Sequence, residues 1–201
     1  ISLIMHATFA YVLAKRDLKG LNLIIIYIMI PWFFSGGMIP EYLLIKRLGL
    51  INTYWSLTIP SAISFGNLLL VRNYIRSLPE SLSESARLDG ASELQILIRI
   101  IVPLSVPILA AIGLFEGVGL WNQYFKVILY IYDSKKMTFQ VVLRSLVLES
   151  AVPEQTSGIV MEVTDNVKMA MTFVGMLPIL IVYPFIQKHF TKGIIVGSIK
   201  G

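Results

Sequence analysis

Long apolar runs separated by short polar stretches dominate the sequence and predict helices that cross a lipid bilayer. A helix needs about 20 mostly apolar residues to cross roughly 30 Å of hydrocarbon. Four runs meet or nearly meet that length, and they predict spans over residues 21–38, 53–71, 100–130 and 169–187. A fifth run, residues 1–14, is too short to span alone. Because it lacks a preceding charged segment, we interpret it as the end of a truncated span and not as a signal peptide.

Positive charges at the ends of these runs predict how the chain crosses the membrane. Lysine and arginine residues cluster after the first run and again between residues 72 and 99. Short loops rich in these residues stay in the cytoplasm. We therefore expect the loop 76–103 and the C-terminus to be cytoplasmic. The segments 39–52 and 133–167 are then expected outside the cell.

The composition supports a membrane protein and excludes several classes of function. Hydrophobic residues make up 56% of the 201-residue chain, charged residues make up 14%, and the mean hydropathy is +0.75. An average soluble domain has about a quarter of its residues charged. The chain has no cysteine, which excludes disulfides, thiolate catalysis and cysteine metal sites. Its net charge of +5 comes from residues at span ends and not from the basic stripe of a nucleic-acid-binding protein.

The sequence offers no metal site and no nucleotide site. Its two histidines, His6 and His189, have no second metal ligand at helical spacing. We interpret them as side chains at a membrane interface or at a helix end. The chain also lacks the Gly-x-x-x-x-Gly-Lys-Ser/Thr loop that cradles ATP phosphates. We therefore expect no cofactor in this chain.

The loop 76–103 predicts two short helices joined by a turn. Ser77 with Glu80, and Ser81 with Glu84, have the spacing of a capping box, so a helix is expected to begin near residues 78–82. Gly90 is a natural helix stop because it adopts left-handed backbone angles without a Cβ clash. A second helix is expected to begin near residue 92 and to run toward residue 103. This pattern alone is equally compatible with a solvated loop between two spans.

The identity of the residues in this loop indicates a family. Residues 84–92 read Glu-Ser-Ala-Arg-Leu-Asp-Gly-Ala-Ser, and Ile-Ile-Val-Pro follows at residues 100–103. They closely resemble the EAA motif of the membrane subunits of ATP-binding-cassette (ABC) importers, whose pattern is Glu-Ala-Ala, three residues, Gly, nine residues, then Ile-x-Leu-Pro. Five positions match at the expected spacing, and two carry mild replacements. The matches are Glu84, Ala86, Gly90, Ile100 and Pro103, and the replacements are Ser85 and Val102.

Other segments resemble the carbohydrate-uptake branch of that family, the MalG-like permeases, and within it the LplC/YtcP-type subunits of Gram-positive bacteria. These segments are residues 48–53, 121–125 and 187–190. The resemblance implies an all-α transmembrane bundle, namely a type I ABC importer permease with the MetI-like fold. It implies one permease domain over residues 1–201, with the first of six spans missing. The cargo of this branch implies a sugar, in particular an oligosaccharide.

The resemblance also implies partners for this chain. In the family, the EAA loop forms a coupling helix that docks in a cleft of a separate ATPase. The residues expected to couple this chain to that ATPase are Glu84, Ala86, Arg87, Asp89 and Gly90. The complete transporter is expected to contain a second permease, an ATPase dimer that holds ATP and Mg, and an extracellular lipid-anchored solute-binding protein. This chain itself is therefore not expected to be an enzyme.

Three residues are candidates for contact with the transported substrate. Glu116 is the only acid inside a predicted span, and a carboxylate at membrane depth is costly enough that a role in the pathway is the first hypothesis. A hydrogen bond to a neighbouring helix is the alternative. Trp121 and Asn122 offer ring stacking and hydrogen bonds to a sugar. Trp121 could equally lie at the membrane interface, and Asn122 could pack between helices.

Other functions fit the sequence less well. An intramembrane enzyme would need several polar groups that converge at membrane depth, and only Glu116 is visible there. A scaffold without transport would leave the coupling motif unexplained. An ABC importer permease for a non-sugar solute, such as an amino acid or phosphate, stays open as an alternative.

Overall fold

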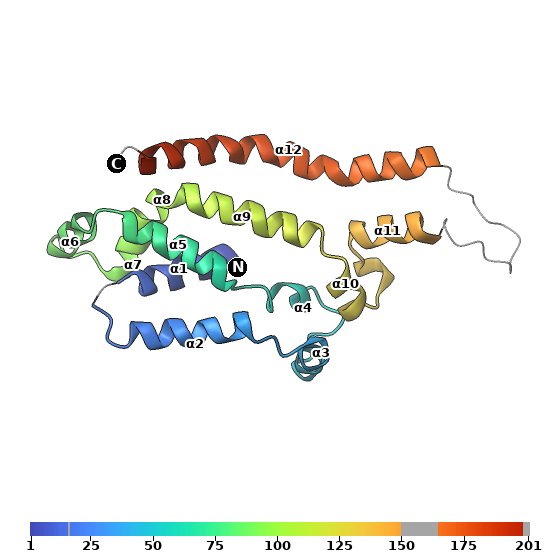
Figure 1. Ribbon diagram of the computed structural model, residues 1–201, viewed down its shortest axis with the longest axis horizontal. Helices are drawn as coiled ribbons and strands as arrows, with labels where there is room; N and C mark the ends of the chain where they lie inside the picture. The colour runs from blue at the N-terminus through green and yellow to red at the C-terminus, as the bar shows by residue number, and fades with distance from the viewer. Residues whose placement is uncertain (16, 150–164, 199–201) are drawn as a thin grey trace, which may run out of the picture.

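The structure is a computed structural model that describes residues 1–15, 17–149 and 165–198. Within these ranges the chain is helical and contains no strand. The longer helices lie side by side along the long axis of the molecule and form a bundle (Figure 1). They are α1 (Ser2–Ala14), α2 (Leu21–Phe33), α5 (Phe65–Ser77), α9 (Val106–Trp121) and α12 (Asp165–Ser198).

Shorter helices occupy the two ends of this bundle. At one end, α6 (Ser81–Leu88) and α7 (Glu93–Ile96) form a loop that projects beyond the long helices. The connection between α1 and α2 lies at the same end, so the two basic loops share one end, as the charge pattern predicts (Figure 1). The opposite end holds α3 (Met38–Arg47), α4 (Trp55–Thr58), α10 (Phe125–Tyr130) and α11 (Phe139–Glu149).

The predicted spans are less regular than the hydropathy pattern implies. Only residues 166–184 of α12 make a single helix that is long and apolar enough to cross a membrane, among the residues described. Two pairs of helices reach the required length together but bend sharply. α2 and α3 meet at 111°, and the helical segment Glu93–Leu104 meets α9 at 77°. The first bend follows the Gly36-Gly37 pair, where Gly37 has a φ of +86°.

The prediction of one continuous span over residues 53–71 is also wrong, because two separate helices cover this segment. The chain forms α4, breaks around Pro60, and starts again as α5 at Phe65. Proline lacks an amide hydrogen and its ring collides with the carbonyl four residues earlier, so it ends or kinks a helix. Such breaks persist in membranes where other protein groups satisfy the freed carbonyls. Here the Ser2 hydroxyl donates a 2.9 Å hydrogen bond to the carbonyl of Ala62 in this break.

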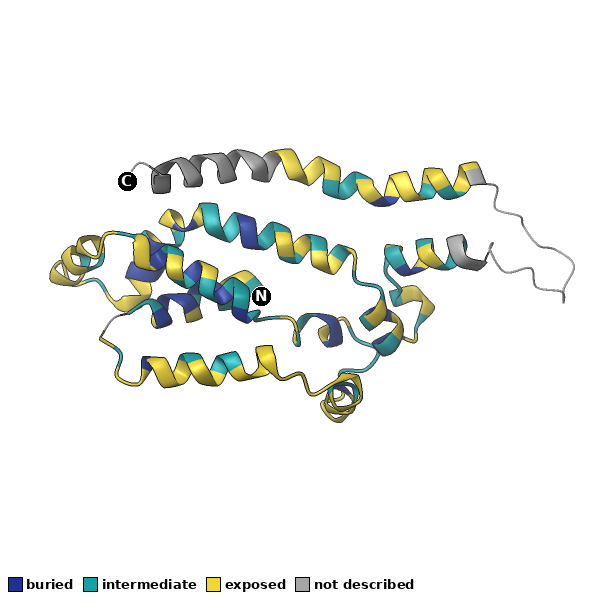
Figure 2. Cartoon of the chain, in the orientation of Figure 1, coloured by how far each residue is buried: buried dark blue, intermediate teal, exposed yellow. Residues whose placement is uncertain are grey.

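The main core lies where α1 packs on α5 and on the chain leading into α9. Its fully buried members come from several separate segments: Ala10, Leu68, Val71, Ile96 and Ile112. In contrast, α2 and α12 present many exposed apolar side chains (Figure 2), including Phe173 and Leu180 on α12. Exposed apolar surface of this extent marks a surface that lipid or another protein chain covers.

A second cluster holds the other end of the bundle together. Its buried residues are Ile45, Leu57, Val127, Tyr130, Ile131 and Val141. Asn52, at a φ of +60°, connects this cluster: its amide donates to the Tyr130 carbonyl at 2.7 Å, and its Oδ1 accepts from the amides of Tyr132 and Asp133. An ion pair of 2.9 Å between Lys126 Nζ and Glu41 Oε1 joins α10 to α3. The bent helix α3 is therefore fixed against the bundle.

Candidate functional site

The turn after α6 is a complete Schellman motif with glycine at its left-handed position. Gly90 has a φ of +83°, as its predicted role as a helix stop requires. The Ala91 amide donates to the Ala86 carbonyl at 2.9 Å, and the Gly90 amide donates to the Arg87 carbonyl at 3.0 Å. These bonds satisfy carbonyls that the end of a helix leaves free. Ala86 and Ala91 both pack against the main core, so the motif fixes α6 onto the bundle.

The start of the second helix is capped, but by residues that the sequence analysis did not select. Ser92 accepts from the Gln95 amide at 3.4 Å, and the Gln95 side chain accepts from the Ser92 amide at 2.8 Å. This reciprocal pair is a capping box. The expected boxes at Ser77 and Ser81 are not formed. Ser77 still belongs to α5 and donates to the Tyr74 carbonyl, while α6 begins at Ser81 with no side-chain cap.

A π-helical segment follows α7 and leads into the membrane. It covers Leu97–Ile101, directly before Pro103. In a regular α-helix, the ring of a proline would clash with the carbonyl four residues earlier. The wider π-helical turn, with its hydrogen bonds between residues five apart, avoids this clash. The chain then turns at Ser105 into α9. The predicted helix from residue 92 to residue 103 is confirmed, but it does not continue straight into the span.

Glu93 links the coupling loop, residues 76–103, to the first helix of the bundle. Its Oε2 accepts from the Tyr11 hydroxyl at 2.5 Å and from Lys15 Nζ at 2.8 Å. Its Oε1 accepts from Arg87 Nε at 3.0 Å. Arg87, which the family resemblance assigns to ATPase contact, is therefore held within its own chain. One carboxylate joins α6, α7 and the end of α1.

The hydrogen bonds around Glu93 determine its charge state. The hydrogen bond from Lys15, followed by that from Tyr11, lowers the pKa of Glu93 to about 2. The hydrogen bond to Glu93 raises the pKa of Arg87. A lowered carboxyl pKa adds stability above its unfolded value of 4.5 and loses it only as the pH falls toward about 2. The Glu93 contacts are therefore fully charged between pH 5 and pH 8.

We expect the Glu93 contacts to respond to salt and not to pH in the physiological range. The Glu93 side chain is 49% exposed, and exposed ion pairs contribute only about 0.2–1 kcal/mol each. Raising the salt from about 0.1 M to about 1 M shortens the screening length from roughly 10 Å to 3 Å. Hydrogen exchange of the α6 and α7 amides should then become several-fold faster in the wild type.

The variant Glu93→Gln separates these ion pairs from the rest of the loop. Its α6 and α7 amides should exchange faster already at low salt and respond little to added salt. Glu84→Gln, a change to an exposed acid of the same loop, serves as the matched control and should behave as the wild type. Salt-independent exchange in the wild type would show that the Glu93 contacts do not stabilise the loop.

The remaining predicted coupling residues form the exposed side of the loop. Glu84, Asp89 and Gly90 are exposed, and between them Leu88 has 89% of its surface accessible. Ala86 is the exception, because it faces the bundle and anchors the helix. Leu88 and the two acids therefore lie on the outer surface of the projecting loop.

The second candidate site surrounds Glu116, in the middle of α9. Oε1 of Glu116 lies 3.2 Å from His6 Nδ1 on α1 and 3.2 Å from Asn67 Nδ2 on α5. His6 is fully buried and only 15% of the Glu116 side chain is exposed. The interpretation of His6 as an interfacial or helix-end side chain is wrong. Three helices bring a histidine, a carboxylate and an amide together inside the bundle.

His6 has polar partners on both sides of its ring. Nε2 lies 3.1 Å from the Ser64 amide and 3.2 Å from the Ser64 carbonyl. Nδ1 lies 3.0 Å from the Ser2 carbonyl and 3.2 Å from the Glu116 carboxylate. The Asn67 side-chain amide donates to Glu116 Oε1 at 3.2 Å. The ring and the carboxylate are therefore held between α1, α5 and α9.

The same geometry argues against hydrolytic chemistry at this site. The Ser2 hydroxyl lies 3.1 Å from His6 Nδ1, the ring nitrogen that also contacts Glu116. In a catalytic triad the serine and the acid bind opposite ring nitrogens. No group of three metal-binding side chains occurs among the described residues either. The polar cluster is consistent with a binding or structural role.

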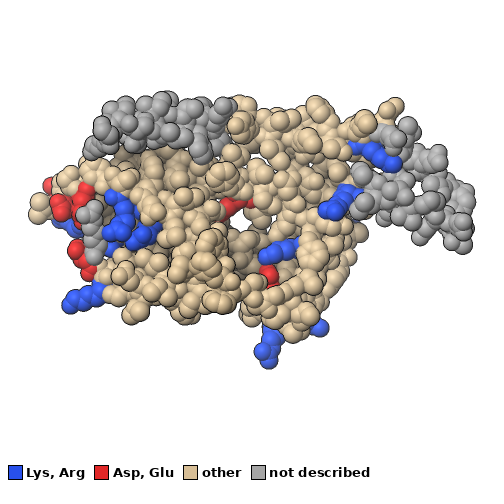
Figure 3. Space-filling view, in the orientation of Figure 1, with Lys and Arg blue, Asp and Glu red and all other residues tan. Residues whose placement is uncertain are grey.

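A cavity of about 490 Å³ opens beside Glu116. Its polar lining consists of hydroxyl, amide and carboxyl groups, and glycines of α9 widen it. The polar lining residues are Ser2, Thr58, Ser61, Ser64, Asn67, Glu116 and Gln123. Figure 3 shows acidic atoms in a hollow near the middle of the molecule and both basic and acidic atoms at the edge of this hollow, while most other charged side chains lie toward the ends of the molecule. This cavity is the candidate substrate site.

The other two predicted substrate residues lie elsewhere. The Trp121 indole donates a 3.0 Å hydrogen bond to the Gly175 carbonyl of α12, and its ring stacks on Phe139 of α11 at 6.1 Å. Trp121 lines a separate apolar pocket of about 210 Å³ between α9 and α12. Asn122 is exposed at the end of α9. Within the described part of the chain, neither residue lines the cavity beside Glu116.

The sequence of this chain is similar to that of known membrane transport proteins. The model of a protein family described as "binding-protein-dependent transport system inner membrane component" matches residues 4–196. Protein LplC of Bacillus subtilis (strain 168) is 45% identical over 205 residues, covering all of this chain and 69% of LplC. The polygalacturonan/rhamnogalacturonan transport system permease protein YtcP of the same organism is 43% identical, covering all of this chain and 72% of YtcP.

A solved structure has the same fold. The crystal structure of a bacterial ABC transporter involved in importing the acidic polysaccharide alginate matches with a TM-score of 0.83 and 34% identity. The match covers 94% of this chain and 69% of the transporter chain. The all-α importer fold predicted from the sequence is confirmed, and so is the predicted family. This chain belongs to the inner membrane components of binding-protein-dependent transport systems, and it has the loop 76–103 at one end of its bundle and a polar cavity beside Glu116.

Proposed function

We propose that this chain is a permease subunit that moves oligosaccharides across the cytoplasmic membrane of a bacterium. The polar cavity beside Glu116 is the observation that supports this proposal most, because its hydroxyl, amide and carboxyl groups match the hydrogen-bonding groups of a sugar. Relatives named for polygalacturonan or rhamnogalacturonan transport and for alginate import support the same class of cargo.

The energy for transport comes from a partner in this proposal. The exposed face of α6, with Leu88 between Glu84 and Asp89, docks against an ATPase subunit that holds ATP and Mg. The Schellman turn at Gly90 and the Glu93 contacts attach α6 to α1 and to the segment that leads into α9, so that these parts move together. Movement of the ATPase then reaches the helices around Glu116.

The complete transporter includes three further kinds of subunit. A second permease covers exposed apolar surface of the bundle, a dimer of ATPase subunits engages the coupling loops, and an extracellular lipid-anchored protein delivers the sugar. This chain performs no covalent chemistry of its own.

The experiment that tests this function is uptake by the purified complex. The permease is tagged, the complex is purified in detergent with its co-purifying subunits, and it is reconstituted into liposomes. ATP-dependent accumulation of uncharged or uronate-bearing oligosaccharides is the expected result. Accumulation of an amino acid or phosphate instead, with no oligosaccharide taken up, would favour the importer of a non-sugar solute.

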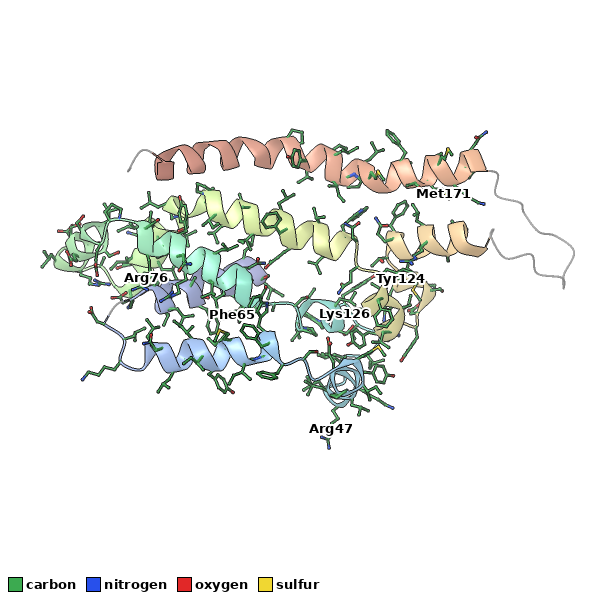
Figure 4. All side chains as sticks on the ribbon, in the orientation of Figure 1. Arg47, Phe65, Arg76, Tyr124, Lys126 and Met171 are labelled. Carbon is green, nitrogen blue, oxygen red and sulfur yellow. The ribbon has the colours of Figure 1, made fainter. Side chains whose placement is uncertain are left out.

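The orientation of the bundle is a separate prediction. We expect Lys19 and the coupling loop to face the cytoplasm and Arg47 of α3 to face outside. Both side chains are exposed and basic, and Figure 4 shows Arg47 pointing away from the bundle. In intact cells, an impermeant thiol reagent should modify Arg47→Cys and leave Lys19→Cys unmodified until the cells are opened. The reverse result would invert the topology.

A further inference from the structure

We infer that Glu116 makes the cavity selective for uncharged oligosaccharides and excludes chains that carry uronate groups. The inference rests on the proposed function, because it names the class of sugar that this cavity accepts. It differs from what the relatives would suggest, since polygalacturonan and alginate are acidic polymers.

The first step concerns the free oxygen of Glu116. Asn67 donates to Oε1, and His6 Nδ1 lies 3.2 Å from the same oxygen. Among the residues described, no side chain or amide donates to Oε2, although Glu116 lines the cavity. Oε2 is therefore available to accept a hydrogen bond from a sugar hydroxyl. These two contacts on Oε1 restrict the rotation of the carboxylate.

The second step concerns the charge of the cavity. Among the described residues, His6 contacts Glu116 from inside the bundle and does not line the cavity. The described lining contains no lysine or arginine. Lys126, on the nearby α10, is held by Glu41 instead. Glu116 is therefore the only ionisable side chain in the described lining, and it is an acid.

The third step is the consequence for the cargo. A uronate carboxylate within a few ångströms of Glu116 would be repelled, and like charges interact strongly at the effective dielectric of a protein interior. A neutral sugar is not repelled by the carboxylate, and one of its hydroxyls donates a hydrogen bond to Oε2 of Glu116. We expect discrimination of at least about tenfold, which corresponds to about 1.4 kcal/mol.

The charge of the cavity can be measured without any substrate. The chain has no native cysteine, and Ser61 lines the cavity and is exposed. In the reconstituted complex, Ser61→Cys is reacted with a cationic trimethylammonium and an anionic sulfonate methanethiosulfonate of similar size. The ratio of the two rates, corrected for a free thiol, should favour the cation by about tenfold. Adding Glu116→Gln should bring the ratio close to one, whereas Asp17→Asn, outside the cavity, should leave it unchanged.

Uptake provides the second measurement. Trigalacturonate and its neutral methyl ester differ mainly in charge, and the wild-type complex should take up the ester at least about tenfold faster. Glu116→Gln keeps an oxygen that accepts from Asn67 but removes the carboxylate charge, so it should bring the two uptake rates closer together. The binding protein is the same in both complexes and does not account for such a change.

The outcomes separate the two hypotheses. A rate ratio near one in the presence of Glu116, or a ratio that Glu116→Gln does not change, overturns the selectivity inference. Faster uptake of the acidic trisaccharide by the wild type also overturns it, while oligosaccharide import itself stands. If the complex takes up no oligosaccharide, the proposed function fails, and the labelling result still determines whether the cavity is negative. If Glu116→Gln fails to assemble, the wild-type labelling ratio alone decides.

Discussion

Replacing Gly90 by valine should abolish sugar uptake while the permease remains in the membrane. Gly90 adopts a φ of +83° in the Schellman turn, and a non-glycine residue there costs about 1 kcal/mol or more, with a β-branched residue among the worst. An added Cβ would meet no atom within 4 Å, so the cost comes from the backbone alone. The turn would open and change the angle of α6.

The expected loss follows from how α6 is held. The bonds from Ala91 to Ala86 and from Gly90 to Arg87 exist only with this backbone conformation. Without these two hydrogen bonds, α6 changes its angle, and its exposed face around Leu88 no longer fits the ATPase surface. Docking of the ATPase, hydrolysis stimulated by the binding protein, and uptake should be lost together. The helices of the bundle lie outside this turn, so membrane insertion and expression should persist.

Two control variants test this explanation. Gly90→Asn should retain most of the activity, because asparagine tolerates the left-handed conformation. Gly20→Val introduces a similar strain, at a φ of +81°, in the connection between α1 and α2 at the same end of the bundle. It should leave ATPase docking intact. Pull-down of the ATPase and uptake in cells measure both effects. Normal docking in Gly90→Val would remove the coupling role, and loss of the permease would indicate a folding role for Gly90.

The sequence predicted the bundle because membrane helices carry their signal in their own composition. The apolar runs, the basic ends and the glycine stop at Gly90 are local features, and the structure places helices and a left-handed turn at these positions. The bends were not predictable from hydropathy, since the window that detects a span averages over proline and glycine. The turns at Gly37, Pro60 and Ser105 depend on which neighbouring groups accept the freed backbone.

Capping-box spacing alone did not predict which serine caps a helix in the loop 76–103. The capping-box spacing occurs three times between residues 77 and 95, and only Ser92 with Gln95 forms the box. Ser77 remained in α5 because Leu78, before Pro79, is forced into an extended conformation and ends that helix. The serine spacing was correct in each case, and the position of the proline decided which serine stood at a helix start.

The polar site could be found only in part from the sequence. Glu116 was visible as an acid inside an apolar run. His6 was not, because its partners lie 58 and 110 positions away, on other helices, and the search for ligands at helical spacing covers only neighbours on one helix. Glu93 was missed for the same reason, since its contacts with Tyr11 and Lys15 join distant segments.

Replacing His6 by leucine should therefore destabilise the permease more than any change to an exposed residue of the bundle. The variant removes the contact between His6 Nδ1 and Glu116 Oε1 and leaves the Ser64 amide without its acceptor. Each buried polar group without a partner costs about 1–3 kcal/mol, and more where the group is charged. The thermal midpoint of the purified complex in detergent, and the amount of permease in the membrane, should both fall.

A second substitution in the same chain distinguishes loss of the contact from loss of packing. Glu116→Gln removes the charge that His6 supports, so the double variant His6→Leu with Glu116→Gln should be more stable than the sum of the two single effects predicts. Directly contacting residues couple by about 0.5–3 kcal/mol in such a cycle. Ser105→Ala is the matched control: the Ser105 hydroxyl is buried but has no hydrogen-bond partner among the described residues, so its removal should cost nothing. Additive effects of His6→Leu and Glu116→Gln would show that the two side chains do not stabilise each other, and the loss would then come from packing alone.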